Sequence, residues 1–396
     1  MSKRPSGQTP TREAIIEAAL SIAQEVGVAG VTGRLVTARA GISASAINYR
    51  FGNIDGLRQA IHMALNEASA MWRTAQLASL TPERCQFLTL GSVVAACIAD
   101  LAQEPDRRAL LLHELREMHL YGTADLASLP HEEWDNHASF YRTLVSRFPH
   151  LQAPPELWAY FAEGAAFLAL MNPNPVFRTA WLASISQRLE DRLARRAFTA
   201  MPSPPEISQP EPTAPLNWPE GKRRLAEATL QIIGNSGLNQ VTHRRVAEAA
   251  GLSLASTTYF FASKDELIHT AFHYLHAIRA TGAFEEERPA TPHYADTLLG
   301  PDGQFRWEIG AYRALHKAAN HIPALRRLIG DLHWRGHSSN RWLKHRGIEP
   351  ADRLDSVLMS MLASGFAQHA MLLPPAERRD YINAAAEQAL ELVFSA

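Results

Sequence analysis

Apolar residues recur along this chain at the three-to-four-residue spacing of one helix face. The first such face is formed by Ile15, Ala19, Ile22 and Val26. The same pattern returns much later at Leu225, Ala228, Thr229 and Ile232. Gly27 and Gly237 follow these two segments and are expected to end their helices. Further helical patterns cover 84–101, 105–120, 132–148, 156–171, 176–197, 304–320, 323–345, 351–372 and 376–395. Because no alternating strand pattern bounded by turn residues is found, the pattern predicts an all-α chain.

A proline-rich segment divides the chain near its middle. Seven prolines lie between Thr199 and Glu220, and this excludes helix and strand there. An extended segment of this length, at about 3 Å per residue, reaches roughly 60 Å. We therefore expect two similar halves joined by a linker. The expected domains are a first head at 1–66, a first regulatory domain at 67–198, the linker at 199–219, a second head at 220–276 and a second regulatory domain at 277–396.

The two halves share a repeat at one fixed offset. The stretch AGISASAINYRFGNIDGL begins at residue 40, and its variant AGLSLASTTYFFASKDEL begins at residue 250, which is 210 positions later. Over 12–57 and 222–267, sixteen of 46 aligned positions are identical. The repeat has threonines suited to cap a short helix (Thr32, Thr242), glycines suited to end it (Gly41, Gly251) and serines suited to cap the next (Ser43, Ser253). Two short helices joined by such a turn predict a helix-turn-helix, whose second helix can enter a DNA major groove.

The repeated residues resemble a known family. Thr, Arg, Ala-Gly-(Ile/Leu)-Ser, Tyr, Phe, an acidic residue and Leu, about twenty residues after an amphipathic helix, are similar to the DNA-binding region of TetR-type repressors. The resemblance covers roughly 50 residues in each half. It implies two tandem TetR-like halves, each with a three-helix DNA-binding head. Behind each head it implies a helical domain that binds a small apolar or aromatic effector and gives two helices to a dimer bundle.

The same resemblance assigns roles to individual residues. The phosphate-contacting positions are Thr32, Tyr49, Thr242, Tyr259 and Lys264. Arg34 and Arg244 are candidates for contacts with the DNA backbone or the groove edge. The base-reading face of the second helix offers Ala44, Ser45, Asn48 and Arg50 in the first half, and Leu254, Ala255, Thr257 and Thr258 in the second. Alternatively, these side chains are merely solvated. Ile54 stands where the family and the second copy have lysine, and Asn48 and Thr258 replace a usual tyrosine.

Two heads in one chain predict an intrachain pseudo-dimer. One helix-turn-helix reads one half-site, and two are needed about 34–36 Å apart. The last two helices of each half are the natural components of a four-helix bundle. Small residues that would permit close approach there are Ala165, Ala166, Ala169, Ala363 and Gly365. The alternative is that two chains associate and present four heads.

The composition limits the other functions. Net charge is −1, so any affinity for double-stranded operator DNA must be local. Residues 1–60 carry seven basic against four acidic residues, and 221–267 carry six against four. Cys85 and Cys97 are expected to be buried thiols in a reducing cytoplasm. No signal peptide, membrane span or phosphate loop is found, and HELRE at 113–117 lacks the second histidine of a zinc protease. We therefore expect a cytoplasmic protein that is not an enzyme and has no cofactor.

The effector region is less defined by sequence. Aromatic and methionine side chains that form either an effector site or plain core are Met118, Trp134, Phe140, Tyr141, Trp158, Phe167, Trp307, Tyr312, Trp334, Trp342 and Met359. His333 and His337 have a metal-edge spacing, but no third ligand is placed by the sequence, so no metal is expected. The favoured function is a ligand-responsive DNA-binding regulator. The alternative is a helical ligand- or protein-binding adaptor whose heads no longer read DNA.

Overall fold

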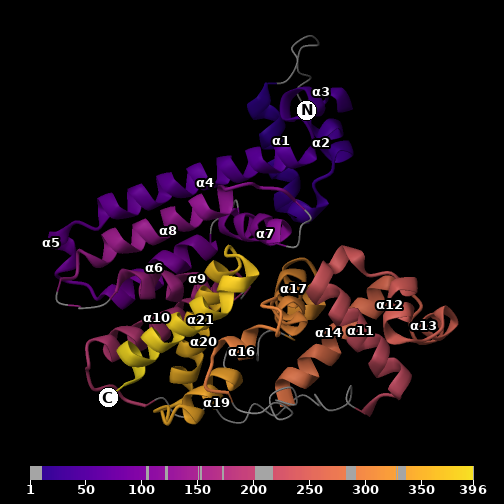
Figure 1. Cartoon of the computed structure of the whole chain (residues 1–396). Helices are drawn as coiled ribbons and strands as arrows, with labels where there is room; N and C mark the ends of the chain where they lie inside the picture. Colours follow the sequence, from indigo (N-terminus) through magenta and orange to yellow (C-terminus); the bar gives the residue numbers. More distant parts are fainter. Residues whose placement is uncertain are drawn as a thin grey trace. The chain divides into compact units, whose positions relative to one another are not determined.

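The computed structural model describes residues 11–103, 107–120, 124–149, 151, 154–171, 174–200, 217–281, 291–326, 328 and 336–395. Within these ranges the chain is built from helices (Figure 1), and β structure is limited to one bridge between Leu299 and Phe305. The all-α prediction is therefore confirmed. None of the described helices is long and apolar enough to cross a membrane. Most of the predicted linker, residues 201–216, lies outside the described residues.

The first compact unit comprises residues 1–87 and 99–148. Its helices are α1 (Arg12–Val26), α2 (Gly33–Ala40), α3 (Ala44–Phe51), α4 (Ile54–Ser79), α5 (Pro82–Cys85), the end of α6 (Leu90–Gln103), α7 (Arg108–Leu120) and α8 (Leu129–Val145), with a 3-10 turn η1 (Val28–Gly30) after α1. One hydrophobic core joins the head to α7: Ile15, Val36 and Leu57 pack in the same cluster as Leu111 and Leu115. α4 also packs against α7 and α8.

The second compact unit comprises residues 88–98 and 149–396. After the beginning of α6, it has α9 (Pro155–Met171), α10 (Pro175–Leu193), α11 (Glu220–Ser236), α12 (His243–Ala250), α13 (Leu254–Phe260), α14 (Lys264–Thr281), α16 (Ala295–Leu298), α17 (Trp307–His321), α19 (His337–His345), α20 (Arg353–Ala370) and α21 (Pro375–Ala389). η3 (Leu238–Gln240) and η4 (Pro323–Leu325) are 3-10 turns, and η6 (Leu390–Phe394) is a π-helical segment that follows α21. α11, the first helix of the segment expected to form the second head, packs against α14 and α17.

Four helices of the second unit form a bundle in which both halves take part. α9 packs along α20, α20 packs against α21, and α10 contacts both α20 and η6 (Figure 1). The two central helices approach closely at Gly164 and Gly365 because a Cβ at Gly164 would overlap the Met361 carbonyl oxygen, and a Cβ at Gly365 that of Tyr160. Buried alanines, among them Ala165, Ala169 and Ala363, surround this contact.

Several helix limits differ from those expected. The predicted helix 84–101 is interrupted between α5 and α6, and 132–148 is shifted to Leu129–Val145 because Pro130 is accepted in the first helical turn. The predicted 323–345 begins with η4, and its described later part is α19, while 329–335 lie outside the described residues. α4 and α14 run through the domain limits expected at 66 and 276, so each head is continuous with a regulatory helix.

Candidate DNA-binding surfaces

The first head has the backbone turns that its sequence predicts. Gly27 ends α1 with φ 80° and ψ 162°. Thr32 caps α2, since its hydroxyl accepts from the Leu35 N–H at 3.4 Å. Gly41 then adopts the left-handed conformation (φ 68°, ψ 38°), in which a Cβ is unfavourable, and the chain turns into α3. Ser43 occupies the next cap position, but its hydroxyl hydrogen-bonds to that of Ser45 at 2.8 Å instead of capping α3.

The second head repeats this backbone. Gly237 has φ 86° and ψ 161°, and Gly251 has φ 61° and ψ 37°, close to the values at Gly27 and Gly41. Thr242 accepts from the Arg245 N–H at 3.2 Å, and Ser253 caps α13 by accepting from the Ser256 N–H at 3.0 Å. Both heads are therefore helix-turn-helix units, with the second helix running from Ala44 or from Leu254.

In the first head, the predicted contact residues lie at the surface. Thr32, Arg34, Ala44, Ser45 and Asn48 are exposed, and Arg50 is half-buried. The Tyr49 side chain is 90% exposed although it is large and aromatic. A large aromatic side chain this exposed is suited to contact a partner, and a phosphate oxygen can accept a hydrogen bond from a tyrosine hydroxyl.

In the second head, one predicted contact residue is buried. Tyr259 is 83% exposed, and Thr242, Arg244, Leu254, Ala255, Thr258 and Lys264 are exposed as well. Thr257, however, is 0% exposed and its hydroxyl donates to the Ser253 carbonyl. The prediction that Thr257 reads a base is therefore wrong: it occupies the core position that Ile47 has in the first head. A threonine is small enough to be buried when its hydroxyl is satisfied within its own helix.

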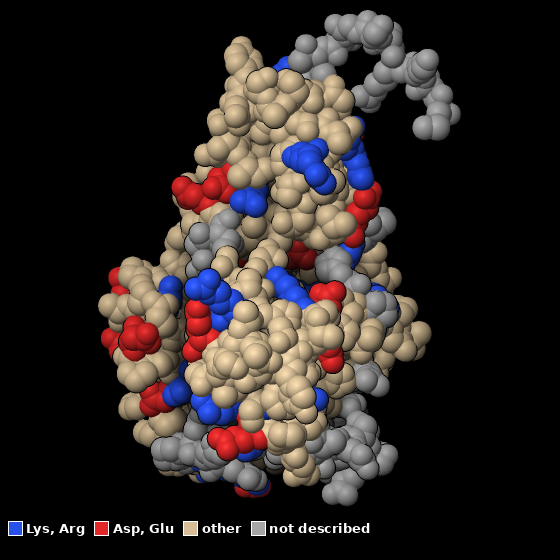
Figure 2. All heavy atoms as spheres, turned by 90° about the vertical axis from the view of Figure 1, so that its right-hand side faces the viewer, with Lys and Arg blue, Asp and Glu red and all other residues tan. Residues whose placement is uncertain are grey.

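The heads have few basic side chains, and several of these form ion pairs or hydrogen bonds with neighbouring residues. Arg244 pairs with Glu248 at 3.0 Å, and Arg39, which sequence reasoning did not single out, pairs with Glu25 at 2.6 Å. Arg245, also missed, donates to Gln240 and Ser236. The Lys264 ammonium lies 3.5 Å from the Asn239 carbonyl oxygen. In the view of Figure 2, small groups of basic side chains alternate with acidic ones, without one broad basic field. A broad electrostatic attraction to DNA phosphates is therefore not a feature of the face seen in this view.

Each head is attached to a helix of the region behind it. In the first unit, the Val28 N–H of η1 donates to the Glu114 carboxylate of α7 at 2.7 Å, and this bond is buried. In the second unit, Gly234 of α11 packs against the backbone of α17 so closely that a Cβ would overlap the Trp307 carbonyl oxygen. α7 is therefore joined directly to the turn after α1, and α17 is joined directly to α11.

A buried polar cluster lies behind the first head. The His62 imidazole of α4 donates to the Glu133 carboxylate of α8 at 3.1 Å, and Arg116 of α7 lies 3.8 Å from the same carboxylate. Burial raises the pKa of Glu133, but Arg116, the hydrogen bond from His62 and the charges of His62 and Arg73 outweigh it and lower the pKa to about 2. An ionised Glu133 thus holds three helices together.

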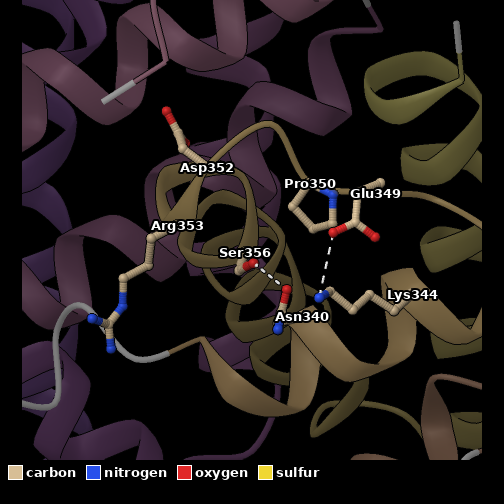
Figure 3. Close-up of a pocket in the computed structure, with 7 residues that line it drawn as sticks. All are labelled: Asn340, Lys344, Glu349, Pro350, Asp352, Arg353 and Ser356. Atoms are coloured by element: carbon tan, nitrogen blue, oxygen red, sulfur yellow. Dashed lines mark hydrogen bonds and ion pairs between the residues drawn. The ribbon is translucent and has the colours of Figure 1, made fainter. Parts of the chain in front are cut away.

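The aromatic residues considered for an effector site are mostly core. Trp134, Phe140, Tyr141, Trp158, Phe167, Trp342 and Met359 are buried, Met118, Trp307 and Tyr312 are partly buried, and Trp334 lies outside the described residues. A separate pocket of about 380 Å³ lies where α19 meets the start of α20 and is lined by Asn340, Lys344, Glu349, Pro350, Asp352, Arg353 and Ser356. In Figure 3, Ser356, Asn340 and Lys344 lie near one another, while the side chains of Asp352 and Arg353 point away from them.

Other chemistry finds little support in the described residues. They contain no group of three or more His, Cys, Asp or Glu side chains that could hold a metal ion. His333 lies outside the described residues, as does the side chain of His337. Cys85 and Cys97 are buried, as expected.

Comparison with known proteins agrees with the geometry of the first head. Residues 15–61, which run from α1 into α4, match the model of the bacterial regulatory proteins of the tetR family. The chain is also similar to the HTH-type transcriptional regulator BetI of Rhizobium meliloti (strain 1021), at 29% identity over 145 residues. That alignment covers 35% of this chain and 71% of the relative. These likenesses concern DNA-binding regulators, not enzymes.

Proposed function

We propose that this chain, a DNA-binding transcriptional regulator of the TetR family, reads its operator with two unlike heads held as an intrachain pseudo-dimer. We further propose that it represses transcription in the cytoplasm and leaves the operator when a small apolar or aromatic effector binds behind the heads. The family match concerns residues 15–61, so the role of the second head rests on its own geometry.

The observation that carries the proposal is the second helix-turn-helix. The turn glycines at 41 and 251 differ by only a few degrees in φ and ψ, and each precedes a short helix with an exposed tyrosine. A helix with only a structural role has no need to present Tyr49 or Tyr259 to solvent. Two heads with the same backbone supply the pair of reading helices that a two-half-site operator requires.

The bundle supports the pairing of the two halves. α9 and α10 come from the first half, α20 and α21 from the second, and they pack as the dimer bundle of two separate subunits would. The Gly164 and Gly365 contacts are reciprocal between the two central helices, as an approximate two-fold axis requires. One chain can therefore supply both subunits of a TetR-type dimer.

The recognition helices of the two heads offer different chemistry. The first presents Asn48 and Arg50, which can make paired hydrogen bonds with adenine and guanine. The second presents Leu254, Ala255 and Thr258, which are suited to thymine methyl contacts and single hydrogen bonds. Since each chain supplies one of each, the operator is expected to have unlike half-sites.

Selection of preferred sites from random double-stranded DNA by the purified chain tests this proposal. We expect an asymmetric consensus. Arg50→Ala should relax base preference in one half-site, by about 1–3 kcal/mol if the contact is bidentate, and Thr258→Ala should alter only the other. A palindromic consensus would show that like heads pair across two chains. Failure to enrich any site would favour the alternative function, a ligand- or protein-binding adaptor whose heads bind no DNA.

A further inference from the structure

The bundle has an approximate two-fold axis that can be located from two contacts. Gly164 of α9 packs on the Met361 carbonyl of α20, and Gly365 of α20 packs on the Tyr160 carbonyl of α9. Both contacts are related by the same shift of 201 residues, so Tyr160 corresponds to Met361 and Gly164 to Gly365. α10 and α21 begin at Pro175 and Pro375, a shift of 200. The contact of α10 with α20 therefore corresponds to that of α21 with α9.

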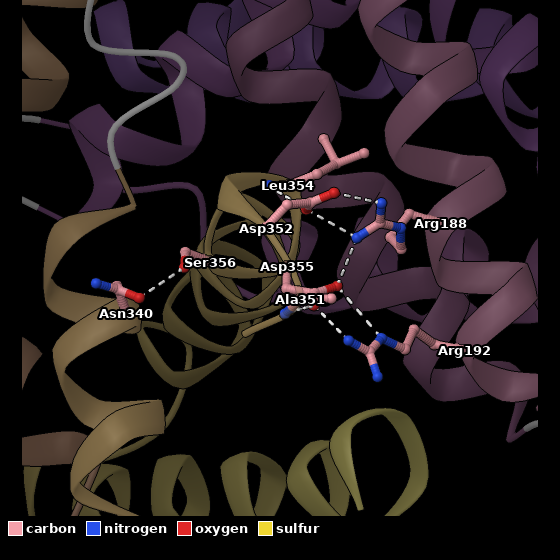
Figure 4. Close-up of polar contacts among 8 residues, drawn as sticks. All are labelled: Arg188, Arg192, Asn340, Ala351, Asp352, Leu354, Asp355 and Ser356. Carbon is pink, nitrogen blue, oxygen red and sulfur yellow. Dashed lines mark hydrogen bonds and ion pairs between the residues drawn. The ribbon is translucent and has the colours of Figure 1, made fainter. Parts of the chain in front are cut away.

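The contact of α10 with α20 contains an ion cluster of Arg188, Arg192, Asp352 and Asp355 (Figure 4), in which the Arg192 side chain is 21% exposed and the other three are buried. The Arg188 guanidinium donates to both Asp352 oxygens at 2.8 and 2.7 Å and to Asp355 at 2.9 Å. Arg192 also donates to both Asp355 oxygens. The arginines come from the first half of the chain and the aspartates from the second.

Because the ion cluster is largely buried, each charged side chain in it needs the opposite charges beside it. The side chains of Arg188, Asp352 and Asp355 are 3%, 6% and 0% exposed. The Phe198 ring covers the Arg188 guanidinium, with 3.9 Å from Cζ to the ring centre. Burial lowers the pKa of Arg188, but its hydrogen bonds to Asp352 and Asp355 and their charges outweigh this and raise it. Removal of either set of charges would leave the other buried and uncompensated, which is strongly unfavourable.

The corresponding contact of α9 with α21 has different chemistry. There the Tyr381 hydroxyl donates to that of Tyr160 at 2.7 Å, and the His369 imidazole lies 2.6 Å from the Tyr381 hydroxyl. By the same shifts of 201 and 200 residues, Asp352 and Asp355 align in the sequence with Leu151 and Pro154, which precede α9, and Arg188 and Arg192 align with Gln388 and Leu392. No member of the ion cluster thus has a charged counterpart across the approximate axis.

We propose that the ion cluster is a recognition surface that makes each half of the bundle select the unlike half and reject a second copy of itself. If two first halves paired, Arg188 and Arg192 would face Leu151 and Pro154. If two second halves paired, Asp352 and Asp355 would face Gln388 and Leu392. Asp352 and Asp355 would keep the backbone N–H groups of Leu354 and Ala351, but either pairing buries charge without an opposite charge, so the preferred partner is the other half. The linker then favours the half within the same chain, because it raises the effective concentration.

This inference deepens the proposed pseudo-dimer, and it can be tested on the full chain without DNA. An acidic variant carries Arg188→Glu and Arg192→Glu, a basic variant carries Asp352→Lys and Asp355→Lys, and a swapped variant carries all four changes. Arg346→Glu is a matched control because Arg346 pairs with Glu387 inside the second half. Mass is measured by light scattering after size exclusion, and stability by thermal unfolding.

We expect the wild-type chain and the control to have the 43.8 kDa mass of one chain. The acidic and basic variants alone should each lose on the order of 10 °C in unfolding temperature, since like charges then meet in a buried contact. The swapped variant should recover much of this loss. An equimolar mixture of the acidic and basic variants should give a species of twice the chain mass, because each half finds its complement only in the other chain.

The proposal is overturned if the acidic variant keeps the wild-type mass and unfolding temperature. It is also overturned if neither the swapped variant nor the mixture of acidic and basic variants recovers stability. This second criterion applies even if the acidic and basic variants fail to fold on their own. A palindromic consensus in the DNA selection would refute the proposed operator independently of these measurements. Conversely, if the charge variants behaved like the wild-type chain, the ion-cluster proposal would fail, but an asymmetric consensus in the DNA selection would still support the proposed operator.

Discussion

Tyr49 and Tyr259 show at the level of single residues how the two heads resemble each other and where they differ. Both rings are exposed at the same position of the second helix. Beside them, Lys264 begins α14, while Ile54 begins α4 in the first head and is half-buried. The second head therefore has a cation at a position where the first has an apolar side chain.

Lys264→Ala should consequently weaken binding to all DNA sequences by a similar factor. One phosphate contact fewer reduces the slope of log affinity against log salt concentration by about one unit. Titrations of the selected operator and of an unrelated duplex at several salt concentrations measure this slope. Lys344→Ala on α19 serves as the control. Unchanged affinity and slope for Lys264→Ala would remove this residue from the interface.

Glu133 makes the stability of the first unit depend on pH in the acidic range. Its folded-state pKa is lowered to about 2, below the ordinary value of 4.5, so its ion pairing stabilises the fold fully above pH 4.5. This stabilisation is lost as the pH falls from 4.5 toward 2, and it amounts to ~3 kcal/mol on an order-of-magnitude basis. Glu133→Gln should lower stability at neutral pH and flatten its decline in that window. An equal acid response in both proteins would show that Glu133 does not carry it.

At the scale of elements, the closest backbone contact in the bundle joins α9 and α20. Gly164→Ala should force these helices apart, because the new methyl group overlaps the Met361 carbonyl oxygen, at a cost of about 1–3 kcal/mol. Ala166→Ser adds one heavy atom at a partly exposed position of α9 and is expected to be nearly neutral. Chemical denaturation of both variants provides the comparison. Equal stability of the two would mean that the helices accommodate the methyl group without cost.

Helix continuity also explains how a regulatory domain can act on a head. α4 extends from the first head to its contacts with α7 and α8, and α7 holds the η1 turn through Glu114 and Val28. In the second unit, α11 packs directly on α17. Packed backbone and one buried hydrogen bond therefore connect each head to the helices behind it.

For the whole molecule, this arrangement predicts linkage between effector and DNA. An effector shifts the heads only if it binds one state more tightly than the other. Small apolar or aromatic compounds that raise the unfolding temperature should therefore also release the operator in a fluorescence anisotropy assay. The matched control is the same compound with a duplex that lacks the site. Compounds that stabilise the chain strongly but leave operator affinity unchanged would contradict this coupling.

The sequence by itself determined the local structure of both heads. Thr32, Thr242, Gly41 and Gly251 act on backbone within a few residues, through a cap or a left-handed turn, so their roles can be predicted from neighbouring positions. Periodicity identified most helices for the same reason. Thr257 was misassigned because its polar side chain favoured the surface, although the repeat aligns it with the apolar Ile47; both positions are buried.

Only the tertiary structure decided how distant segments combine. The approach of Gly164 to Met361 and the pairing of Arg188 with Asp352 join residues more than 160 positions apart, and neither residue type nor spacing specifies such a partner. Glu114 and Glu133 likewise resemble ordinary surface acids in the sequence, and burial against Val28 and His62 gives them their roles. Local conformation depends on near neighbours along the chain, whereas burial and charge pairing depend on which helix faces meet in space, and that is fixed only by the packed fold.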